Sequence, residues 1–348
     1  YELSGDNATY GQGSVEGIEM AIEQVNAEGG INGKKIVPVK YDNKSEPAEA
    51  TTLATKLMTQ DKVLAVIGPA TTGAFKATIP VAEKNKIPVA SGSATADDVT
   101  YDASGLKEYA FRICFSDSYQ GTAMAAYATE KLDAKKAVII KDNSSDYGKG
   151  LAENFTQKFT ELGGEIVAEE AYVQKETDFN AIITKIKGLD YDVIYLPGYY
   201  NEAGLIIKQA RAQGINVPIL GADGFAAPEL VELAGTSALT DVYFTNHYSS
   251  LDESTKVQDF IASFKERYNK EPDGFHALGY DLAKFVVDAI GRAEALNGEA
   301  VKSALESTEN FEGVTGTISI DENHNAVKDI LVIKYVDGVQ SSVERIGE

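Results

Sequence analysis

Five loops of the sequence carry hydroxyl, phenol or carboxylate side chains directly after short apolar segments. They read PATTG, GSATADD, DNSSDYGKG, YYNEAG and ADGFAAPE. Backbone N–H groups at a helix start, with Thr or Ser hydroxyls beside them, attract an anion such as a carboxylate. An acidic side chain can pair with a cation, and tyrosines can enclose an apolar stem while their hydroxyls stay hydrogen-bonded. Loops of this composition could hold a zwitterion, and an amino acid fits that description.

The side chains that could do this chemistry are few. Asp223 is the candidate partner of a cation, and Tyr147 and Tyr199 could enclose an apolar stem. The simpler alternative for each loop is helix capping, because Ser, Thr, Asp and Asn are preferred N-cap residues. Tyrosine does not cap helices, and SGSAT supplies more hydroxyls than one helix start can use. The hydroxyl candidates for holding an anion are Thr71, Thr72, Ser93 and Thr95.

Short apolar strands and amphipathic helices alternate along the chain, and these elements must position the loops. Residues 13–28 place Ile18, Ile22 and Val25 at helical spacing, and IVPVKYD at 36–42 alternates like a strand. Alternation of this kind predicts parallel sheets covered on both faces, in two doubly wound α/β lobes. Ligands of such sheets bind beyond the carboxyl ends of the strands. Further strands are predicted at 63–68, 87–91, 110–115, 136–141, 165–173, 192–198, 217–221 and 241–248, and further helices at 47–60, 73–85, 118–132, 149–162, 178–188, 201–213, 227–234, 253–269 and 276–296.

Length and composition narrow the class of protein. The 348 residues, 43% of them hydrophobic, suffice for two globular cores. Thirty-two Lys and Arg against 53 Asp and Glu give a net charge of -21, which disfavours nucleic acid and anionic membranes as partners. No apolar run reaches the roughly 18 residues of a membrane span. The chain opens on YELSGDN rather than on a secretory signal, so if the protein is exported, we expect this sequence to be its mature form.

Motifs for catalysis or metal binding are missing. The sequence has no phosphate-binding GxxxxGK[ST] loop, no complete GxGxxG, no HExxH and no GxSxG elbow with plausible partners. His247, His276 and His324 lack metal-ligand spacing, so we interpret them as structural or solvent-facing. Cys114 has no partner for a disulfide and fits a small buried hydrophobe. We therefore expect no cofactor, no metal and no enzymatic activity; an α/β enzyme acting on an amino acid or amide would need a nucleophile or base with a positioned partner.

Several segments, taken in order, resemble one family across nearly the whole chain. They include SGDNATYGQGSVEGIEMAIEQVNAEGGINGKKI, VIGPATTGA, IPVASGSATADDVT, DNSSDYGKGLAENF, GADGF and FEGVTGTISIDENHN. The chain is similar to substrate-binding proteins of ABC importers with the type I periplasmic binding protein fold, in the subfamily for branched-chain amino acids. This resemblance implies two Rossmann-like lobes, joined by three crossover segments, that close over a ligand.

The resemblance also implies a role for individual residues. Thr72, with Thr71 beside it, corresponds to the family's carboxylate-binding loop. The Ser93 carbonyl would receive the ligand ammonium, and Thr95 would help to hold the carboxylate. The acidic partner of the ammonium falls on Asp223. The aromatic residues that the family pattern places around the ligand fall on Tyr10, Tyr147, Tyr199 and Phe275.

Lobe boundaries follow from the same resemblance. Lobe 1 would comprise residues 1–117 and 249–322, and lobe 2 residues 118–248 and 323–348. Members of the family begin with a short apolar strand that lies inside the first sheet, immediately before the segment equivalent to YELSG. We therefore expect that residues of the natural protein are missing from this sequence or were rearranged; if the truncation is real, the first sheet would have a gap with unpaired backbone groups, and lobe 1 would be marginally stable.

The ligand and its destination remain hypotheses at this stage. The predicted pocket wall is small and aromatic, so leucine, isoleucine and valine come first, and alanine, threonine or an aromatic amino acid stay open. The resemblance implies delivery to an ABC permease, by a monomer located in the periplasm or held at the cell surface as a lipoprotein. The alternative is a ligand-binding receptor or sensor domain of the same fold for another small amino acid or amide.

Overall fold

The chain forms two compact units, each described here by itself. The computed structural model describes residues 1–346. Residues 1–115 and 252–328 form the first unit, and residues 116–251 and 329–346 form the second. Residues 323–328, which the sequence analysis assigns to lobe 2, lie in the first unit. There Asn325 Oδ1 accepts a hydrogen bond from Arg112 Nε at 2.8 Å, and His324 Nδ1 lies 3.0 Å from the carbonyl oxygen of Ala110.

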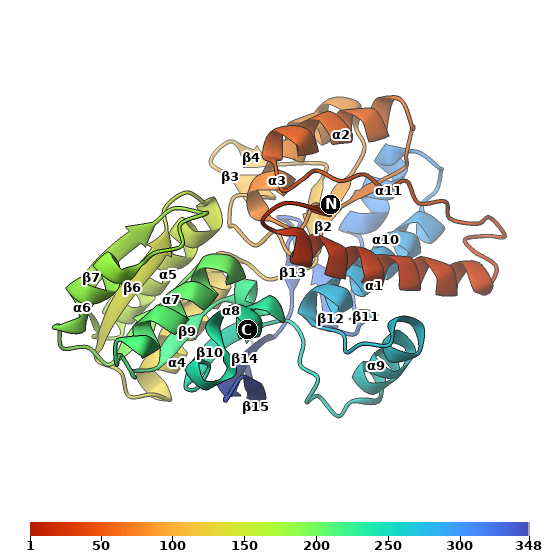
Figure 1. Cartoon of the computed structure of the whole chain (residues 1–348). Coiled ribbons are helices and arrows are strands. Elements are labelled where there is room, and N and C mark those ends of the chain that lie inside the picture. The colour runs from red at the N-terminus through yellow and green to blue at the C-terminus, as the bar shows by residue number, and fades with distance from the viewer. Residues whose placement is uncertain (347–348) are drawn as a thin grey trace. The chain divides into compact units, whose positions relative to one another are not determined.

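A three-stranded parallel sheet forms the centre of the first unit (Figure 1). Its order is β1-β2-β5, and every pair in it is parallel. Two small antiparallel sheets accompany it, β3 with β4 and β11 to β13. The strands are β1 (Val66–Ile67), β2 (Val89–Ser91), β3 (Tyr101–Asp102), β4 (Gly105–Leu106), β5 (Ala110–Arg112), β11 (Phe311–Gly313), β12 (Gly316–Ile320) and β13 (Ala326–Val327), and the helices are α1 (Ala8–Ala27), α2 (Pro47–Thr59), α3 (Thr72–Asn85), α9 (Thr255–Tyr268), α10 (Gly274–Arg292) and α11 (Gly298–Glu306).

Helices cover both faces of this sheet. Val66 packs in a buried cluster with Ala54 of α2 and Phe75 of α3. Its neighbour Ile67 packs against the cluster that contains Ile18 of α1 and Ala283 of α10. Because successive strand residues point to opposite faces, α2 and α3 lie on one side of β1, and α1 and α10 lie on the other.

Helices α1 and α10 approach each other through glycine. A Cβ atom on Gly17 would lie 2.0 Å from the carbonyl oxygen of His276, and one on Gly279 would lie 2.0 Å from that of Ser14. Only glycine permits backbones to meet at this distance. The crossing also brings the first turn of α1 close to the first turn of α10. These two turns carry the predicted binding residues Tyr10 and Phe275.

The predicted strand at residues 36–42 is wrong, because this segment forms no ladder in the structure. The alternation of apolar and polar residues is present, but strand β1 is the edge of its sheet and no neighbouring strand lies beside it within residues 1–346. The segment is held at its start instead, where the Asn26 side chain bonds both the N–H and the carbonyl of Ile36, at 2.8 and 2.9 Å. Alternation of apolar and polar residues indicates on which face of a strand each side chain lies. It does not show whether a neighbouring strand is present to pair with it.

The second unit contains one seven-stranded sheet. Its order is β15-β14-β10-β9-β8-β6-β7, parallel from β7 to β10 and antiparallel at β14 and β15. The predicted alternation of strands and helices is present throughout. The strands are β6 (Lys136–Asp142), β7 (Glu165–Tyr172), β8 (Val193–Tyr195), β9 (Ile219–Gly221), β10 (Val242–Asn246), β14 (Ile330–Val336) and β15 (Val339–Ile346); the helices are α4 (Asp117–Glu130), α5 (Asp146–Glu161), α6 (Asn180–Lys187), α7 (Tyr200–Ala212) and α8 (Glu229–Ala234), with 3-10 turns η1 (Asp223–Phe225) and η2 (Thr236–Ala238).

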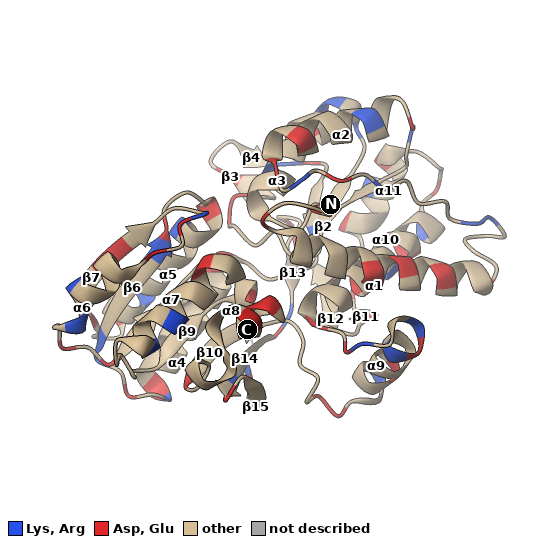
Figure 2. Ribbon diagram, in the orientation of Figure 1, with Lys and Arg blue, Asp and Glu red and all other residues tan. Residues whose placement is uncertain are grey.

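The net negative charge is carried by both units. Figure 2 shows Asp and Glu on elements of each of them, interspersed with Lys and Arg. Within residues 1–346, none of the helices combines the length and the apolar character that crossing a membrane requires.

Arg112 organises a loop of the first unit from inside the core. Its side chain is buried, and Nη1 donates to the carbonyl oxygens of Thr95 and Ala96, both at 2.8 Å. We predict that Arg112→Met lowers the free energy of unfolding by about 3 kcal/mol or more, because the buried carbonyls lose a charged donor. Urea unfolding followed by circular dichroism measures this loss.

The matched control is Arg345→Met. Arg345 is half exposed and bonds Asp329 at 3.4 Å, so its removal should change the free energy of unfolding by under about 0.5 kcal/mol. Equal effects of the two substitutions would show that the loop does not depend on Arg112.

His276 links α10 to α1 through two carboxylates. Its Nδ1 lies 2.7 Å from Asp273 and its Nε2 lies 2.9 Å from Glu16. Burial acts to lower the pKa of His276, but the two carboxylates outweigh it and raise the pKa from 6.5 to about 9. A raised pKa stabilises the fold fully below about pH 6.5, and this contribution disappears as the pH rises through about 9.

We therefore predict that wild-type protein loses up to about 3 kcal/mol of stability between pH 6.5 and 9 through this group. His276→Gln should be less stable at pH 6 and should lack that part of the decline. Urea unfolding of both proteins at several pH values measures the difference. Parallel pH profiles for the two proteins would contradict the assignment.

Candidate functional site

The loops that follow β1 and β2 are joined by hydroxyl groups. Ser91 Oγ donates to the carbonyl of Pro69 at 2.8 Å, and Ser93 Oγ donates to that of Ala70 at 2.9 Å. Thr72 Oγ1 accepts from the backbone N–H of Ala96 at 3.3 Å, so its own proton stays available as a donor. The structure thus brings together the hydroxyl residues that the sequence analysis takes from two separate segments.

Glu2 occupies the start of α3. Its buried carboxylate accepts hydrogen bonds from the N–H groups of Ala70 and Thr71, both at 3.0 Å, and from Thr71 Oγ1 at 2.7 Å. The anion that this helix start attracts is therefore a side chain of the protein itself. The sequence analysis did not single out Glu2, because its partners are 68 and 69 residues away and no local pattern connects them.

The backbone of Thr95 is held in place, and its hydroxyl group could bond a ligand. Its carbonyl accepts from Arg112, and its side chain is fully buried. Within residues 1–346, Thr95 Oγ1 has no hydrogen-bond partner. Since buried hydroxyls are normally bonded, this atom can donate to or accept from a ligand.

Tyr10 and Phe275 form an aromatic pair in the first unit. Their ring centroids lie 4.4 Å apart at 36°, and both side chains are buried. Tyr10 comes from the first turn of α1, and Phe275 comes from the first turn of α10, whose N-cap residue is Asp273. The pair supplies a rigid apolar surface at the glycine crossing of the two helices.

Asp223 is the centre of the polar residues in the second unit. It begins the 3-10 turn that follows β9, and its Oδ1 accepts from Tyr147 Oη at 2.7 Å. The same phenol oxygen accepts from the N–H of Gly224 at 2.9 Å. Tyr199 stacks on Tyr147 with centroids 5.0 Å apart and ring planes 4° apart. The structure therefore brings together all three candidates that the sequence analysis names in this unit.

Gln120 of α4 fixes Asp223 from a second side. Gln120 Nε2 donates to Asp223 Oδ1 at 3.1 Å and to Asp117 Oδ1 at 3.0 Å. Gln120 Oε1 accepts from Thr245 Oγ1 at 2.6 Å and from the N–H of Asp223 at 3.3 Å. Both ends of this amide are engaged, so its orientation and that of the Asp223 carboxylate are determined together. The sequence analysis missed Gln120, which lies 103 residues from Asp223.

His247 and Tyr195 lie in the same part of the second unit. His247, which the sequence indicated to be structural or solvent-facing, is buried, and its Nε2 lies 3.5 Å from Asp223 Oδ2. Burial raises the pKa of the Tyr195 phenol, and the negative charges of Asp117 and Asp223 raise it further. Among residues 1–346, no group of three His, Cys, Asp or Glu is arranged to hold a metal ion. The arrangement offers a negative carboxylate in a buried setting, which suits a small organic cation.

The chain matches one family model over nearly its whole length. Residues 1–340 match the family model described as periplasmic binding protein. An amino acid binding protein of Pseudomonas aeruginosa is 36% identical over 236 residues, which are 67% of this chain and 61% of that protein. The Leu/Ile/Val-binding protein homolog 3 of Brucella melitensis biotype 1 is 30% identical over 338 residues, 97% of this chain and 90% of that protein.

A solved structure is similar over almost the entire chain. The branched-chain amino acid transporter substrate binding protein LivJ from Streptococcus pneumoniae, in complex with isoleucine, superposes with a TM-score of 0.94 and 44% identity. The match covers 99% of this chain and 97% of that one. This likeness confirms the predicted type I periplasmic binding protein fold.

A substitution at Gln120 tests how Asp223 is held. We predict that Gln120→Leu lowers the free energy of unfolding by about 2 kcal/mol, because the buried Asp223 carboxylate and the Thr245 hydroxyl each lose a partner. Urea unfolding measures the change. Gln157→Leu is the control, since Gln157 is exposed and its side chain bonds the exposed Glu161. A loss of under about 0.5 kcal/mol in both variants would show that Gln120 does not support the carboxylate.

Proposed function

We propose that this chain, which belongs to the periplasmic binding protein family, captures a branched-chain amino acid outside the cytoplasm and delivers it to an ABC import permease. The observation that carries the proposal is the buried Asp223 carboxylate, held through Oδ1 by Tyr147 and Gln120. A fixed carboxylate in a buried site attracts an ammonium group more strongly than it would in water. Binding, and no chemical conversion, is the task that these residues suit.

The ligand carboxylate is assigned to the first unit. Thr72 retains a hydroxyl proton, and Thr95 Oγ1 has no partner among residues 1–346. Both can donate to a carboxylate, in loops whose backbone is already fixed. Thr71 has a different role in this proposal, because its N–H and hydroxyl bind Glu2. Thr71 would position the loop, and the Ser93 carbonyl would accept from the ligand ammonium.

The preference for an aliphatic side chain rests on the aromatic residues. Tyr10 and Phe275 in the first unit, and Tyr147 and Tyr199 in the second, offer ring surfaces instead of charges. An isoleucine-bound protein at 44% identity and a relative named for leucine, isoleucine and valine support the same class of ligand. We assign leucine, isoleucine and valine as ligands on this basis.

The partner and the location belong to the same proposal. The family membership supports a site of action outside the cytoplasm, in the periplasm or at the cell surface as a lipoprotein. A monomer that docks on its permease with ligand bound is the form we propose. Co-purification with the membrane permease in the presence of leucine, and its loss without ligand, would test this part.

Calorimetric titration of the refolded protein tests the ligand assignment. Unfolding and refolding removes amino acid carried through purification. We expect one-to-one binding of leucine, isoleucine and valine, weaker binding of alanine and phenylalanine, and none of glutamate. A folded protein that binds none of these amino acids would refute the proposed ligand class.

Two substitutions test the proposed contacts to the ligand ammonium and to the ligand carboxylate separately. We predict that Asp223→Asn weakens binding of leucine about 30-fold or more, because the ammonium loses a buried ionic partner worth about 2–5 kcal/mol. Thr72→Val should weaken it about tenfold through one hydrogen bond to a charged group. The same titration measures both. Asp178→Asn, an exposed carboxylate of the second unit, is the control and should bind as wild type does.

A further inference from the structure

Asparagine is followed by glycine at two places in the chain, Asn32–Gly33 and Asn297–Gly298. In such a pair the backbone nitrogen of glycine can attack the side-chain carbon Cγ of asparagine, because glycine has no Cβ to hinder the approach. A bond forms between this nitrogen and Cγ, the bond from Cγ to the side-chain nitrogen breaks, and ammonia leaves. Water then opens the five-membered ring at either carbonyl, which yields aspartate or isoaspartate. The reaction needs no enzyme, so the local structure decides which pair reacts.

Asn32 and Gly33 are the two central residues of a tight turn. The N–H of Ile31 donates to the carbonyl of Lys34 at 2.8 Å, and the N–H of Lys34 donates to the carbonyl of Ile31 at 2.9 Å. Both central residues have positive φ, 50° for Asn32 and 78° for Gly33, as in the type I′ turn that asparagine followed by glycine favours. Ile31 and Lys34 form an isolated bridge outside the named strands, so these two hydrogen bonds close the turn.

The reacting groups of this turn are accessible. Asn32 and Gly33 are both exposed. Within residues 1–346, neither the Asn32 side-chain amide nor the Gly33 N–H has a hydrogen-bond partner. A Cβ atom on Gly33 would meet nothing within 4 Å, so the space that ring closure needs is available.

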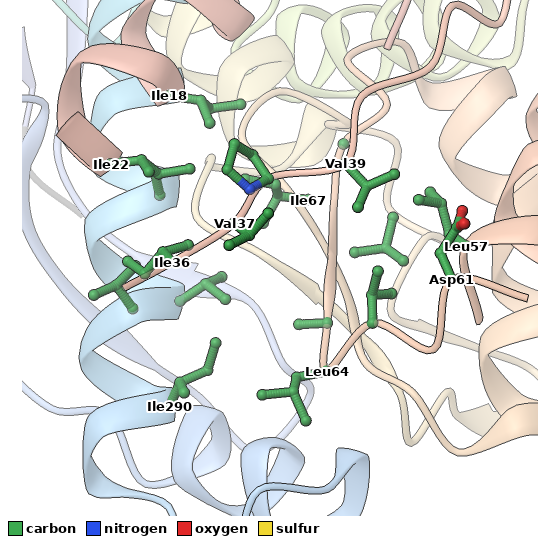
Figure 3. Close-up of a pocket in the computed structure, with 18 of the residues that line it drawn as sticks. Ile18, Ile22, Ile36, Val37, Val39, Leu57, Asp61, Leu64, Ile67 and Ile290 are labelled. Atoms are coloured by element: carbon green, nitrogen blue, oxygen red, sulfur yellow. The ribbon is translucent and has the colours of Figure 1, made fainter. Parts of the chain in front are cut away.

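Ring closure requires rotation about the bond between Cα and the carbonyl carbon of Asn32, so the turn must open. The chain that follows the turn stays fixed, because the Asn26 side chain bonds the N–H and the carbonyl of Ile36. Ile36 and Ile22 of α1 also line the same apolar cavity (Figure 3). Opening is therefore confined to a few exposed residues, and local opening of this kind costs little free energy.

Asn297 is exposed as well, but its surroundings oppose the same reaction. It is the N-cap residue of α11, and its Oδ1 accepts from the N–H of Ala300 at 2.9 Å. Gly298 is buried, and a Cβ atom there would lie 2.0 Å from the carbonyl oxygen of Lys86. Before the Gly298 nitrogen reaches Cγ, the cap bond must break and the start of α11 must leave this contact. The two pairs share their chemistry and differ in conformational freedom.

We propose that Asn32 is a site of spontaneous deamidation in the folded protein and that Asn297 is protected from it. Either product adds a negative charge to a chain whose net charge is already -21. Isoaspartate also leads the main chain through the side-chain carbons, which lengthens the two-residue turn by one atom. Because turn length sets the register of the flanking residues, the bridge between Ile31 and Lys34 is lost in this form.

The test is incubation of the folded 348-residue protein at pH 8.5 and 37 °C, followed by digestion and mass spectrometry. Replacement of the amide –NH₂ by –OH changes the peptide mass, and chromatography separates the aspartate and isoaspartate forms. Asn32 should convert about tenfold faster than Asn297 or more, since Asn297 reacts only after a costlier opening. In urea the two pairs should convert at similar rates, because the unfolded chain presents the same pair of residues twice.

Gly33→Ala is the matched variant. The added methyl group meets no neighbouring atom, and the strain of alanine at positive φ is confined to the turn. This variant should convert at Asn32 about tenfold more slowly, because a Cβ hinders the attacking nitrogen, and Asn297 should be unchanged. Circular dichroism checks that the variant is folded. In the isoaspartate form of the wild-type protein, the N–H of Lys34 should exchange with solvent about tenfold faster, because its hydrogen bond across the turn is lost.

Two outcomes would overturn the inference. The first is conversion of Asn32 and Asn297 at equal rates in the folded protein, which would show that the local structure does not select the site. The second is an Asn32 that stays intact in the folded protein over the time in which the chain in urea converts. That result would show that the turn protects its asparagine.

Discussion

The strand-end loops of the first unit depend on two buried side chains of opposite charge. Glu2 accepts hydrogen bonds from the N–H groups of Ala70 and Thr71, just before α3, and Arg112 donates to the carbonyls of residues 94–96. A buried charge is stable only when hydrogen-bonding groups surround it, so each of these side chains fixes the backbone around it. Thr72 and Thr95 therefore present their hydroxyls from loops whose backbone is fixed, so little conformational entropy would be lost in the ligand binding that we propose for them.

In the second unit, the amide side chain of Gln120 fixes its neighbours in a similar way. Gln120 bonds two carboxylates through its NH₂ group and accepts two hydrogen bonds through its oxygen. The Asp223 carboxylate is thereby oriented, with Tyr147 bonded to the same oxygen. A carboxylate fixed in this way loses little conformational entropy on binding, which supports the role that we propose for Asp223 as the partner of a ligand ammonium.

The alternation of strands and helices was predictable because it follows from side-chain burial, which periodicity records. The candidates Tyr147, Tyr199 and Asp223 were predictable as residues at strand ends, and the structure brings them together. Glu2 and Gln120 were not predictable, because their partners lie 68 and 103 residues away and no local spacing encodes such contacts. The strand at 36–42 was predicted wrongly for a related reason: pairing requires a neighbour, and a sequence pattern shows only the side chains that a strand would bury.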